Sequence, residues 1–255
     1  FILFFYFLFV MFSGQFGLDH TLYHFGSGSD ARYSDMNGFE PYVWRLIWYK
    51  LYWGSFAVLL AFSSNLFWNR GLTGDFKSRW ATAKYRLTPK MKNGIITFGL
   101  VFIGLGSFIF YNTNILNEYH RSNYWEKRSA DYEKTYKKFK GVPQPKITGV
   151  SGEVHLFPKE ARVEFSGVYQ MKNKTDSVID TIHTNFNRQA PYSSFAWSRP
   201  TETVFTDSSY GWDMFVFDPP IQPEDEFFLE FSGERKRTGF SNGGVNRTVV
   251  ENGTM

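Results

Sequence analysis

The stretch that decides the fold is GIITFGLVFIGLGSFIFY, residues 94–111, which holds 18 residues and no charged side chain. About 20 apolar residues in an α-helix cross the hydrocarbon core of a bilayer. A helix also pairs its backbone polar groups internally, as a lipid environment demands. The stretch therefore predicts a membrane-spanning helix. Gly99, Gly104 and Gly106 would let a neighbouring helix approach closely, although glycine is also simply common in such helices.

Two other apolar runs precede this one. Residues 46–68 form a run of 23 residues in which Lys50 is the one interior charge, and aromatic side chains cluster at both ends. This pattern predicts a second span. Residues 1–13, FILFFYFLFVMFS, carry no charge but are too short to span alone. They predict the last part of a longer span in a chain truncated at both ends; a signal peptide is the alternative, and it lacks a basic n-region.

The orientation of the spans is predicted by their flanking charges. Residues 70–92, taken as a loop, hold seven Lys or Arg and one acid, whereas the loop over 18–42 holds one Lys or Arg. Short basic loops stay in the cytoplasm. Residues 117–140 also hold seven basic residues, which argues the other way, but four acids offset them. We therefore expect a multi-pass plasma (inner) membrane protein with 70–92 cytoplasmic and 113–255 periplasmic or extracellular.

The chain is expected to have three parts: a transmembrane region over 1–112, an amphipathic stalk or linker over 113–146, and an extracytoplasmic β-domain over 147–255. In the stalk, aromatic side chains recur at intervals of seven, four and three residues, which predicts a helix over 117–140 that ends before Pro143 and Pro145. These aromatic residues are Trp125, Tyr132, Tyr136 and Phe139.

From residue 147 onward the pattern changes to β-strands. In one run Phe165, Gly167, Tyr169 and Met171 share a face, and polar residues fill the other. A turn is expected over residues 219–223, which contain three prolines. The fold class is therefore transmembrane α-helices followed by a mostly antiparallel β-sandwich or open sheet. The predicted strands are 153–157, 162–171, 178–186, 212–217 and 226–234.

Residues with the chemistry of a site are scarce. The chain has no cysteine and no H-E-x-x-H, phosphate-binding loop or G-x-S-x-G motif. His20 and His24 are four residues apart but lack a third ligand, so we interpret them as surface or interface histidines rather than a metal pair. The acidic run 224–226 is interpreted as a solvent-exposed turn. We name no catalytic, cofactor-binding or metal residue. The basic residues behind the net charge of +4 lie in two local runs that suit the flanks of membrane helices, so the charge does not indicate a nucleic-acid-binding surface.

Several separated blocks resemble a known bacterial family. They are YSDMNG (33–38), GLGSFIFYNTNIL (104–116), ADYEKTYKKFKGVPQPKIT (130–148) and GEVHLFPKEARVEFSGVYQMKNKT (152–175). Together they look like proteins in which an ABC-2-type transporter permease is fused to an M1-family, alanyl aminopeptidase-like zinc metallopeptidase. The resemblance covers the chain from about Leu18 to Met255.

Within the β-region, the resemblance is to the N-terminal domain of M1 peptidases. The family pattern V-x-L-x-P matches Val154 to Pro158, and G-x-Y-x-x-x-N-x-T matches Gly167 to Thr175. Segments 219–225 and 239–242, the latter reading GF-x-N, are expected in later strands, and VVENGT (249–254) resembles the approach to the catalytic half.

The resemblance implies a zinc aminopeptidase whose metal ligands, catalytic glutamate and amine-binding motif lie beyond residue 255. No cofactor is expected within these residues, and zinc is expected in the downstream domain. The implied partners are the lipid bilayer, a peptide substrate and an ABC ATPase subunit. Two alternatives stay open: a transporter permease subunit with an outer binding domain, and an adhesion-type sandwich on a helical anchor.

Overall fold

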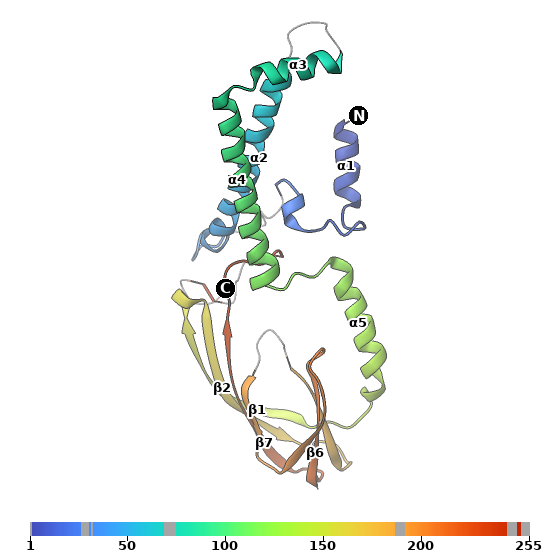
Figure 1. Cartoon of the computed structure of the whole chain (residues 1–255). Helices are drawn as coiled ribbons and strands as arrows, with labels where there is room; N and C mark the ends of the chain where they lie inside the picture. The colour runs from blue at the N-terminus through green and yellow to red at the C-terminus, as the bar shows by residue number, and fades with distance from the viewer. Residues whose placement is uncertain are drawn as a thin grey trace. The chain divides into compact units, whose positions relative to one another are not determined.

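The computed structural model describes residues 2–26, 31, 33–68, 75–186, 192–243 and 249–250. The chain divides into two compact units (Figure 1). The helical unit comprises Phe1–Ser122 and Thr238–Val245, and the β-unit comprises Asn123–Arg237 and Asn246–Met255. The helical unit therefore includes a segment that follows the last strand.

The helical unit contains two helices that are long and apolar enough to cross a membrane, Tyr42–Phe67 and Pro89–Leu116. They cover the two predicted spans, and each begins earlier than expected because a proline, Pro41 or Pro89, occupies its first turn, where no N–H donor is needed. Helix α1 has 11 residues, about 16 Å at about 1.5 Å per residue. The elements are α1 (Ile2–Phe12), η1 (Thr21–Tyr23), α2 (Glu40–Phe67), α3 (Phe76–Arg86), α4 (Pro89–Phe110) and the π-helical turn η2 (Tyr111–Leu116).

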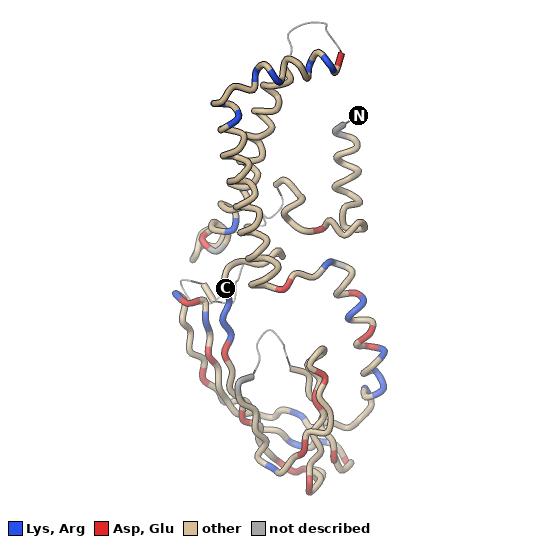
Figure 2. Tube along the Cα trace, in the orientation of Figure 1, with Lys and Arg blue, Asp and Glu red and all other residues tan. Residues whose placement is uncertain are grey.

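The prediction of a loop over residues 70–92 is wrong over 76–86, which form helix α3, and over 89–92, which begin α4; residues 70–74 of that prediction lie outside the described residues. The sequence of α3, FKSRWATAKYR, is rich in alanine and long basic side chains, which favour helix, and its charge alone suggested a loop. Arg86 donates to the backbone carbonyls of Asn65, at 3.0 Å, and Trp68. A basic side chain thus satisfies carbonyls at the C-terminal end of α2. Figure 2 shows Lys and Arg along α3, whereas the apolar lengths of α2 and α4 carry few charges.

Helices α2 and α4 run side by side (Figure 1). Aromatic rings of the two helices pack against each other. The ring of Tyr52 stacks on Phe102, with centroids 4.6 Å apart. A Cβ atom at Gly106 would lie 3.1 Å from Tyr52, but one at Gly104 or Gly99 would have no neighbour within 4 Å. The prediction that glycine admits a close helix neighbour is therefore confirmed at Gly106 and is wrong for the other two within this unit.

The β-unit consists of helix α5 and two antiparallel sheets, with strand orders β1-β2-β7-β4 and β3-β6-β5. Strands β4 and β5 were not predicted, because both are short and neither has a clear apolar alternation. The elements are α5 (Ser122–Tyr136), η3 (Lys137–Phe139), β1 (Lys146–Phe157), η4 (Pro158–Glu160), β2 (Arg162–Lys172), β3 (Ile179–Asn185), β4 (Tyr192–Trp197), β5 (Thr201–Asp207), β6 (Trp212–Ile221) and β7 (Glu226–Lys236).

The turn predicted over residues 219–223 begins too early, because strand β6 continues through both prolines to Ile221. The pairing of β3 with β6 shifts register here, from Thr181 opposite Val216 to Ile179 opposite Ile221. Proline lacks an N–H donor and is tolerated in a strand where the ladder is interrupted. The register shift places Pro219 and Pro220 in such an interruption.

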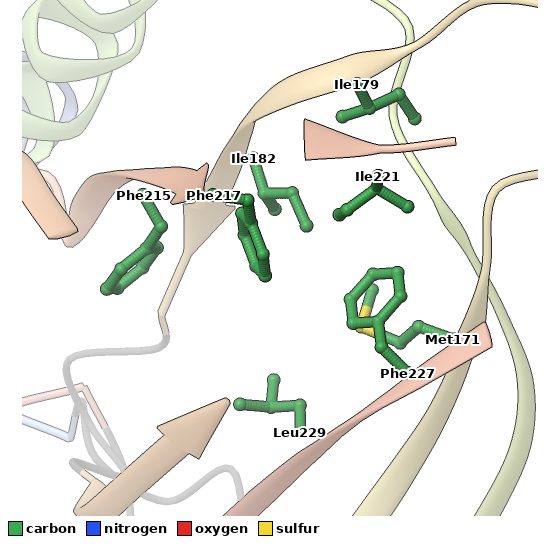
Figure 3. Packing of buried hydrophobic residues seen from close by; sticks show 8 residues of the cluster. All are labelled: Met171, Ile179, Ile182, Phe215, Phe217, Ile221, Phe227 and Leu229. Atoms are coloured by element: carbon green, nitrogen blue, oxygen red, sulfur yellow. The ribbon is translucent and has the colours of Figure 1, made fainter. Parts of the chain in front are cut away.

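Residues from both sheets form one buried apolar cluster (Figure 3). Phe217 of β6 and Phe227 of β7 are each only 1% exposed, and their rings meet edge to face with centroids 5.7 Å apart. Burying a side chain of this size stabilises the fold by about 1.5–3 kcal/mol. The predicted shared face of β2 is confirmed, since Met171 lies in the cluster and Tyr169 packs against it. The cluster comprises Met171, Ile179, Ile182, Phe215, Phe217, Ile221, Phe227 and Leu229.

Helix α5 packs its aromatic side on strand β6. The ring of Tyr136 stacks on Trp212 with centroids 4.5 Å apart, and its hydroxyl donates to Asp207 Oδ2 at 2.5 Å. Burial and this hydrogen bond raise the pKa of Tyr136, while donation from Tyr136 lowers the pKa of Asp207. The predicted amphipathic helix is present but begins later than residue 117. Tyr132, Tyr136 and Phe139 pack on Trp212, whereas Trp125 is 52% exposed.

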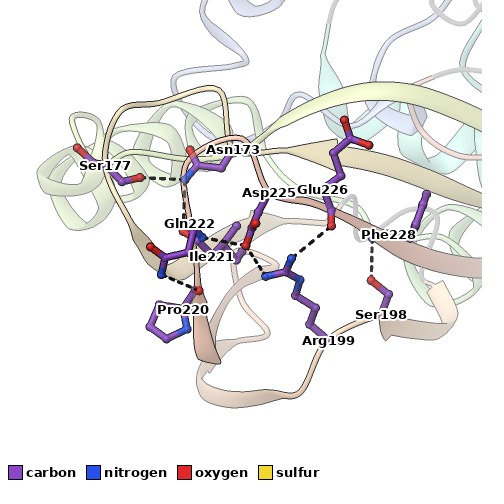
Figure 4. Close-up of polar contacts among 10 residues, drawn as sticks. All are labelled: Asn173, Ser177, Ser198, Arg199, Pro220, Ile221, Gln222, Asp225, Glu226 and Phe228. Atoms are coloured by element: carbon purple, nitrogen blue, oxygen red, sulfur yellow. Dashed lines mark hydrogen bonds and ion pairs between the residues drawn. The ribbon is translucent and has the colours of Figure 1, made fainter.

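The turn after β2 is organised by Asn173, which is fully buried (Figure 4). Its side-chain amide donates to the carbonyls of Ser177, at 2.8 Å, and Ile221, at 3.3 Å, and its Oδ1 accepts the N–H of Thr175 at 3.0 Å. Its backbone N–H donates to the carbonyl of Asp225 at 3.0 Å. One asparagine therefore ties the β2–β3 turn to the β6–β7 turn, which explains why that position of the G-x-Y-x-x-x-N-x-T block carries an amide.

The close approach at Gly106 predicts a position-specific cost of a large side chain. Gly106→Leu should lower the free energy of unfolding by about 1–3 kcal/mol, because the new side chain must displace Tyr52. Gly104→Leu is the matched control, since it adds the same side chain to the same helix in open space. Thermal unfolding followed by circular dichroism in detergent measures the difference; equal melting temperatures for the two variants would contradict the packing described.

Candidate functional site

Polar side chains are buried together in the helical unit, at a place we call the polar node. It is formed by the loop before α2, by α2, by η2 and by the segment 238–243. Burying polar groups costs free energy unless each finds a hydrogen-bond partner, so such a cluster must be specific in its pairing. The node contains His20 (5% exposed), Thr21 (8%), Arg45 (5%), Asn112 (4%) and Thr113 (0%), with Asn242.

Asn242 receives hydrogen bonds on both its side chain and its backbone. The backbone N–H of Thr21 donates to Asn242 Oδ1 at 2.9 Å, and the Thr21 hydroxyl donates to the Asn242 carbonyl at 3.2 Å. The guanidinium of Arg45 donates to the same carbonyl at 2.7 Å. Three donors from two distant parts of the chain thus hold one residue of the segment that follows β7.

The rest of that segment is held by Asn117 and by an apolar anchor. Asn117 Nδ2 donates to the carbonyls of Thr238, at 3.0 Å, and Phe240, at 3.3 Å. Phe240 is 5% exposed and packs with Ile109 in a buried cluster. Gly239 has φ +65°, and a Cβ there would lie 2.2 Å from Asn112 Oδ1. Glycine is therefore required at this position both for its conformation and for space.

This placement corrects the expectation for the GF-x-N motif. Residues 239–242 do not form a later strand of the β-domain; they dock in the helical unit. The physical reason is that each residue of the motif finds a partner there: Gly239 at Asn112, Phe240 in the apolar cluster and Asn242 at Arg45.

His20 links the loop to η2. Its Nδ1 accepts the backbone N–H of Leu22 at 3.1 Å, and its Nε2 lies 3.1 Å from Thr113 Oγ1 and 3.0 Å from Asn114 Oδ1. Because the amide oxygen can only accept, this arrangement assigns the proton of a neutral imidazole to Nε2. Burial lowers the pKa of His20, outweighing the Asn114 hydrogen bond and the Asp19 charge, which raise it.

A second candidate surface lies on the four-stranded sheet of the β-unit. The face that carries Met171 and Phe227 continues onto β1 as an apolar surface that we call the sheet patch: Val150, Val154 and Leu156. These three side chains are 65%, 63% and 40% exposed. The opposite face of the same strands carries charged residues such as Glu153 and Glu164. An apolar sheet face left open beside a buried core is typical of a docking surface.

Other predicted site residues have separate partners. His20 and His24 have different hydrogen-bond partners. His24 Nε2 donates to the Leu18 carbonyl at 2.7 Å, whereas His20 Nε2 lies beside Thr113 and Asn114. His20, predicted to be a surface or interface histidine, is buried in the polar node, where it joins the loop before α2 to η2. In the parts of the chain that the structure describes, no group of three His, Cys, Asp or Glu could hold a metal ion.

The acidic run 224–226 is a turn, as predicted, and its carboxylates are paired. Lys172 Nζ lies 2.8 Å from Glu224 Oε2 and 3.6 Å from Glu226 Oε1, and these pairings raise the pKa of Lys172. Asp225 accepts from Arg199 at 2.8 Å and from the N–H of Gln222 at 3.1 Å, both of which lower its pKa (Figure 4). The run therefore closes the turn between β6 and β7.

Comparison with known proteins gives structural matches alone, since no protein-family model and no curated protein matches the chain. An M1 zinc metallopeptidase from Deinococcus radiodurans matches 38% of this chain at 11% identity with a TM-score of 0.30. A mutant M1 zinc metallopeptidase from the same organism, bound to a Tyr-Ser-Ala substrate, matches 36% at 12% identity with a TM-score of 0.28. A two-domain M1 zinc metallopeptidase mutant bound to L-tryptophan matches 38% at 13% identity with a TM-score of 0.29.

The matched part of this chain spans about a fifth, 21%, of each of these three structures. At such TM-scores no residue role is transferred from them. None of the three bears on the permease half of the resemblance, which stays a prediction.

The environment of His20 predicts a pH dependence. Its folded pKa lies below the ordinary value of 6.5, so its contribution to stability is complete above that pH. As the pH falls below 6.5, the unfolded chain takes up a proton that the fold resists, because a proton on Nδ1 would face the N–H of Leu22. The protection of the Leu22 amide against hydrogen exchange should therefore fall with pH, by at most about tenfold per pH unit.

His20→Gln should remove this acid-dependent loss of protection, whereas His155→Gln, at an exposed position of β1, should retain it. An unchanged pH profile in His20→Gln would show that His20 is not the titrating group.

Proposed function

We propose that this chain is the membrane-anchoring and N-terminal β-domain segment of a membrane-bound M1-type zinc aminopeptidase, which hydrolyses N-terminal residues from peptides in the full-length protein. The observation that carries the proposal is the combination, in one chain, of two membrane-length helices with an antiparallel β-unit that leaves the apolar sheet patch open. The sequence blocks that resemble the M1 N-terminal domain lie in that β-unit.

The two family patterns correspond to definite structural features. Val154 to Pro158 is the end of β1 and the start of the turn η4, which leads the chain back into β2. Gly167 to Thr175 runs along β2 into the turn organised by Asn173. These blocks thus build the β1–β2 hairpin and its exit, which supports their use as a signature of this domain.

The helices α2 and α4 support membrane anchoring, with α3 on the cytoplasmic side and the β-unit on the periplasmic or extracellular side. The basic side chains of α3 favour that orientation under the positive-inside rule. On this proposal the β-unit meets peptides outside the cytoplasm.

The sheet patch fits docking against the catalytic domain expected downstream. Its three aliphatic side chains offer an apolar surface without charge, and covering it would remove exposed hydrocarbon from water. The zinc of such an enzyme would activate a water molecule in that downstream domain. The described residues of this chain offer no ligand set for the metal, so their part is to anchor the enzyme and support its catalytic half.

The proposal is tested with the full-length protein expressed in its host membrane. Intact cells should hydrolyse a membrane-impermeant alanyl-anilide substrate, and a zinc chelator should reduce the rate by tenfold or more, about 1.4 kcal/mol in activation free energy. Val154→Asp in the sheet patch should lower kcat/KM through loss of docking, whereas Val204→Asp, at an equally apolar but separate exposed position on β5, should not. Chelator-insensitive activity, or no activity in membranes that contain the protein, would rule the function out.

A further inference from the structure

An apolar cavity of about 280 Å³ lies within the helical unit. It is bounded by α1, by the loop before α2, and by the aromatic faces of α2 and α4. Its lining carries hydrocarbon and aromatic rings, and the polar atoms among the lining side chains are the two tyrosine hydroxyls and the indole Nε1 of Trp53. The lining residues are Phe9, Leu18, Leu22, Tyr23, Tyr52, Trp53, Phe56 and Phe102.

A lysine lies next to this cavity. The ammonium of Lys50 is 5.9 Å from the centroid of the Phe25 ring, and Phe25 meets Trp53 edge to face with centroids 5.6 Å apart. Trp53 lines the cavity and follows Lys50 by three residues on α2, so the two share one side of the helix. Lys50 is exposed, and the described residues provide no carboxylate ion pair for it.

The depth of these groups suits a lipid. The apolar run on α2 begins at Leu46, about 6 Å before Lys50 at about 1.5 Å per residue, which is within reach of the headgroup layer for a lysine side chain. Trp53 and Phe56 lie one and two turns further into the span. A cation at headgroup depth with an apolar cavity beside it matches the two ends of one phospholipid molecule.

We infer that the cavity binds an acyl chain of an anionic phospholipid whose phosphate pairs with Lys50. The inference rests on the proposed membrane placement of α2 and α4. Charge complementarity selects the occupant: a neutral apolar helix would fill the cavity but leave the ammonium without a counter-ion, whereas an anionic lipid satisfies both. The bound lipid would fix the loop 18–25 against α2, next to the polar node.

The test uses the full-length protein purified in detergent and titrated with phosphatidylglycerol or phosphatidylcholine, with bound lipid counted by native mass spectrometry. Phosphatidylglycerol should bind about fivefold more tightly than phosphatidylcholine, because one lysine beside an anionic headgroup contributes about 1 kcal/mol. Lys50→Gln should abolish that preference, and Leu22→Trp, which fills the cavity, should weaken both lipids. Lys77→Gln on α3 and Leu60→Trp on an exposed part of α2 are the matched controls and should change neither affinity.

Retention of the protein in membranes washed at alkaline pH separates this inference from the proposed function. If the protein stays in the membrane but binds both lipids equally, or if Lys50→Gln keeps the preference, the lipid site is overturned and the anchoring stands. If the alkaline wash releases the protein, both are overturned.

Discussion

The pairing of Asn242 with Thr21 and Arg45 is the constraint on which the arrangement of the chain depends. Arg45 is 5% exposed and Thr21 8%, so their donors have little water to bond with if Asn242 is removed. A buried donor without an acceptor costs about 1–3 kcal/mol, more than most surface contacts contribute. These three hydrogen bonds therefore favour the observed position of the segment after β7 in the helical unit.

The consequence for the chain is that it returns to the helical unit after its last strand. The chain leaves the helical unit at Ser122, builds the β-unit through Arg237, and enters the helical unit again at Thr238. Gly239 and Phe240 make that return specific, the first by its positive φ and its contact with Asn112, the second by burial.

Apolar length and strand alternation predicted much of this fold. Two long apolar helices were evident at 46–68 and 94–111, because about 20 consecutive apolar residues are typical of a helix of membrane-spanning length. The face shared by Tyr169 and Met171 was evident from alternation. Helix α3 was missed because charge density was taken as a loop signal, and β6 was cut short because proline was taken as a turn signal. Local sequence patterns do not show the distant features that favour these two elements. For α3 the feature is the set of carbonyls at the end of α2 to which Arg86 donates. For β6 it is the register shift opposite Ile179.

The polar node was beyond the reach of local patterns for a different reason. His20, Arg45, Asn112 and Asn242 are far apart in sequence, and nothing in their own neighbourhoods shows that they meet. The available signal was the run YNTNILN at the end of the third apolar stretch, where several amides need hydrogen-bond partners. Asn117 finds two of them in the backbone carbonyls of Thr238 and of Phe240, the second of which belongs to the GF-x-N motif. That motif was assigned to a strand because the family resemblance, rather than its hydrogen-bonding needs, guided its placement.

Hydrogen exchange in Asn242→Ala tests the central claim most directly. Loss of Oδ1 removes the acceptor of the Thr21 N–H, so the protection of Thr21 and of residues 238–243 should fall by about 5- to 150-fold, equivalent to about 1–3 kcal/mol. Asn242→Asp keeps a side-chain oxygen that can accept the Thr21 N–H and should retain most of the protection. Unchanged protection of the Thr21 amide in Asn242→Ala would contradict the account, because the segment would then be held by something other than the polar node.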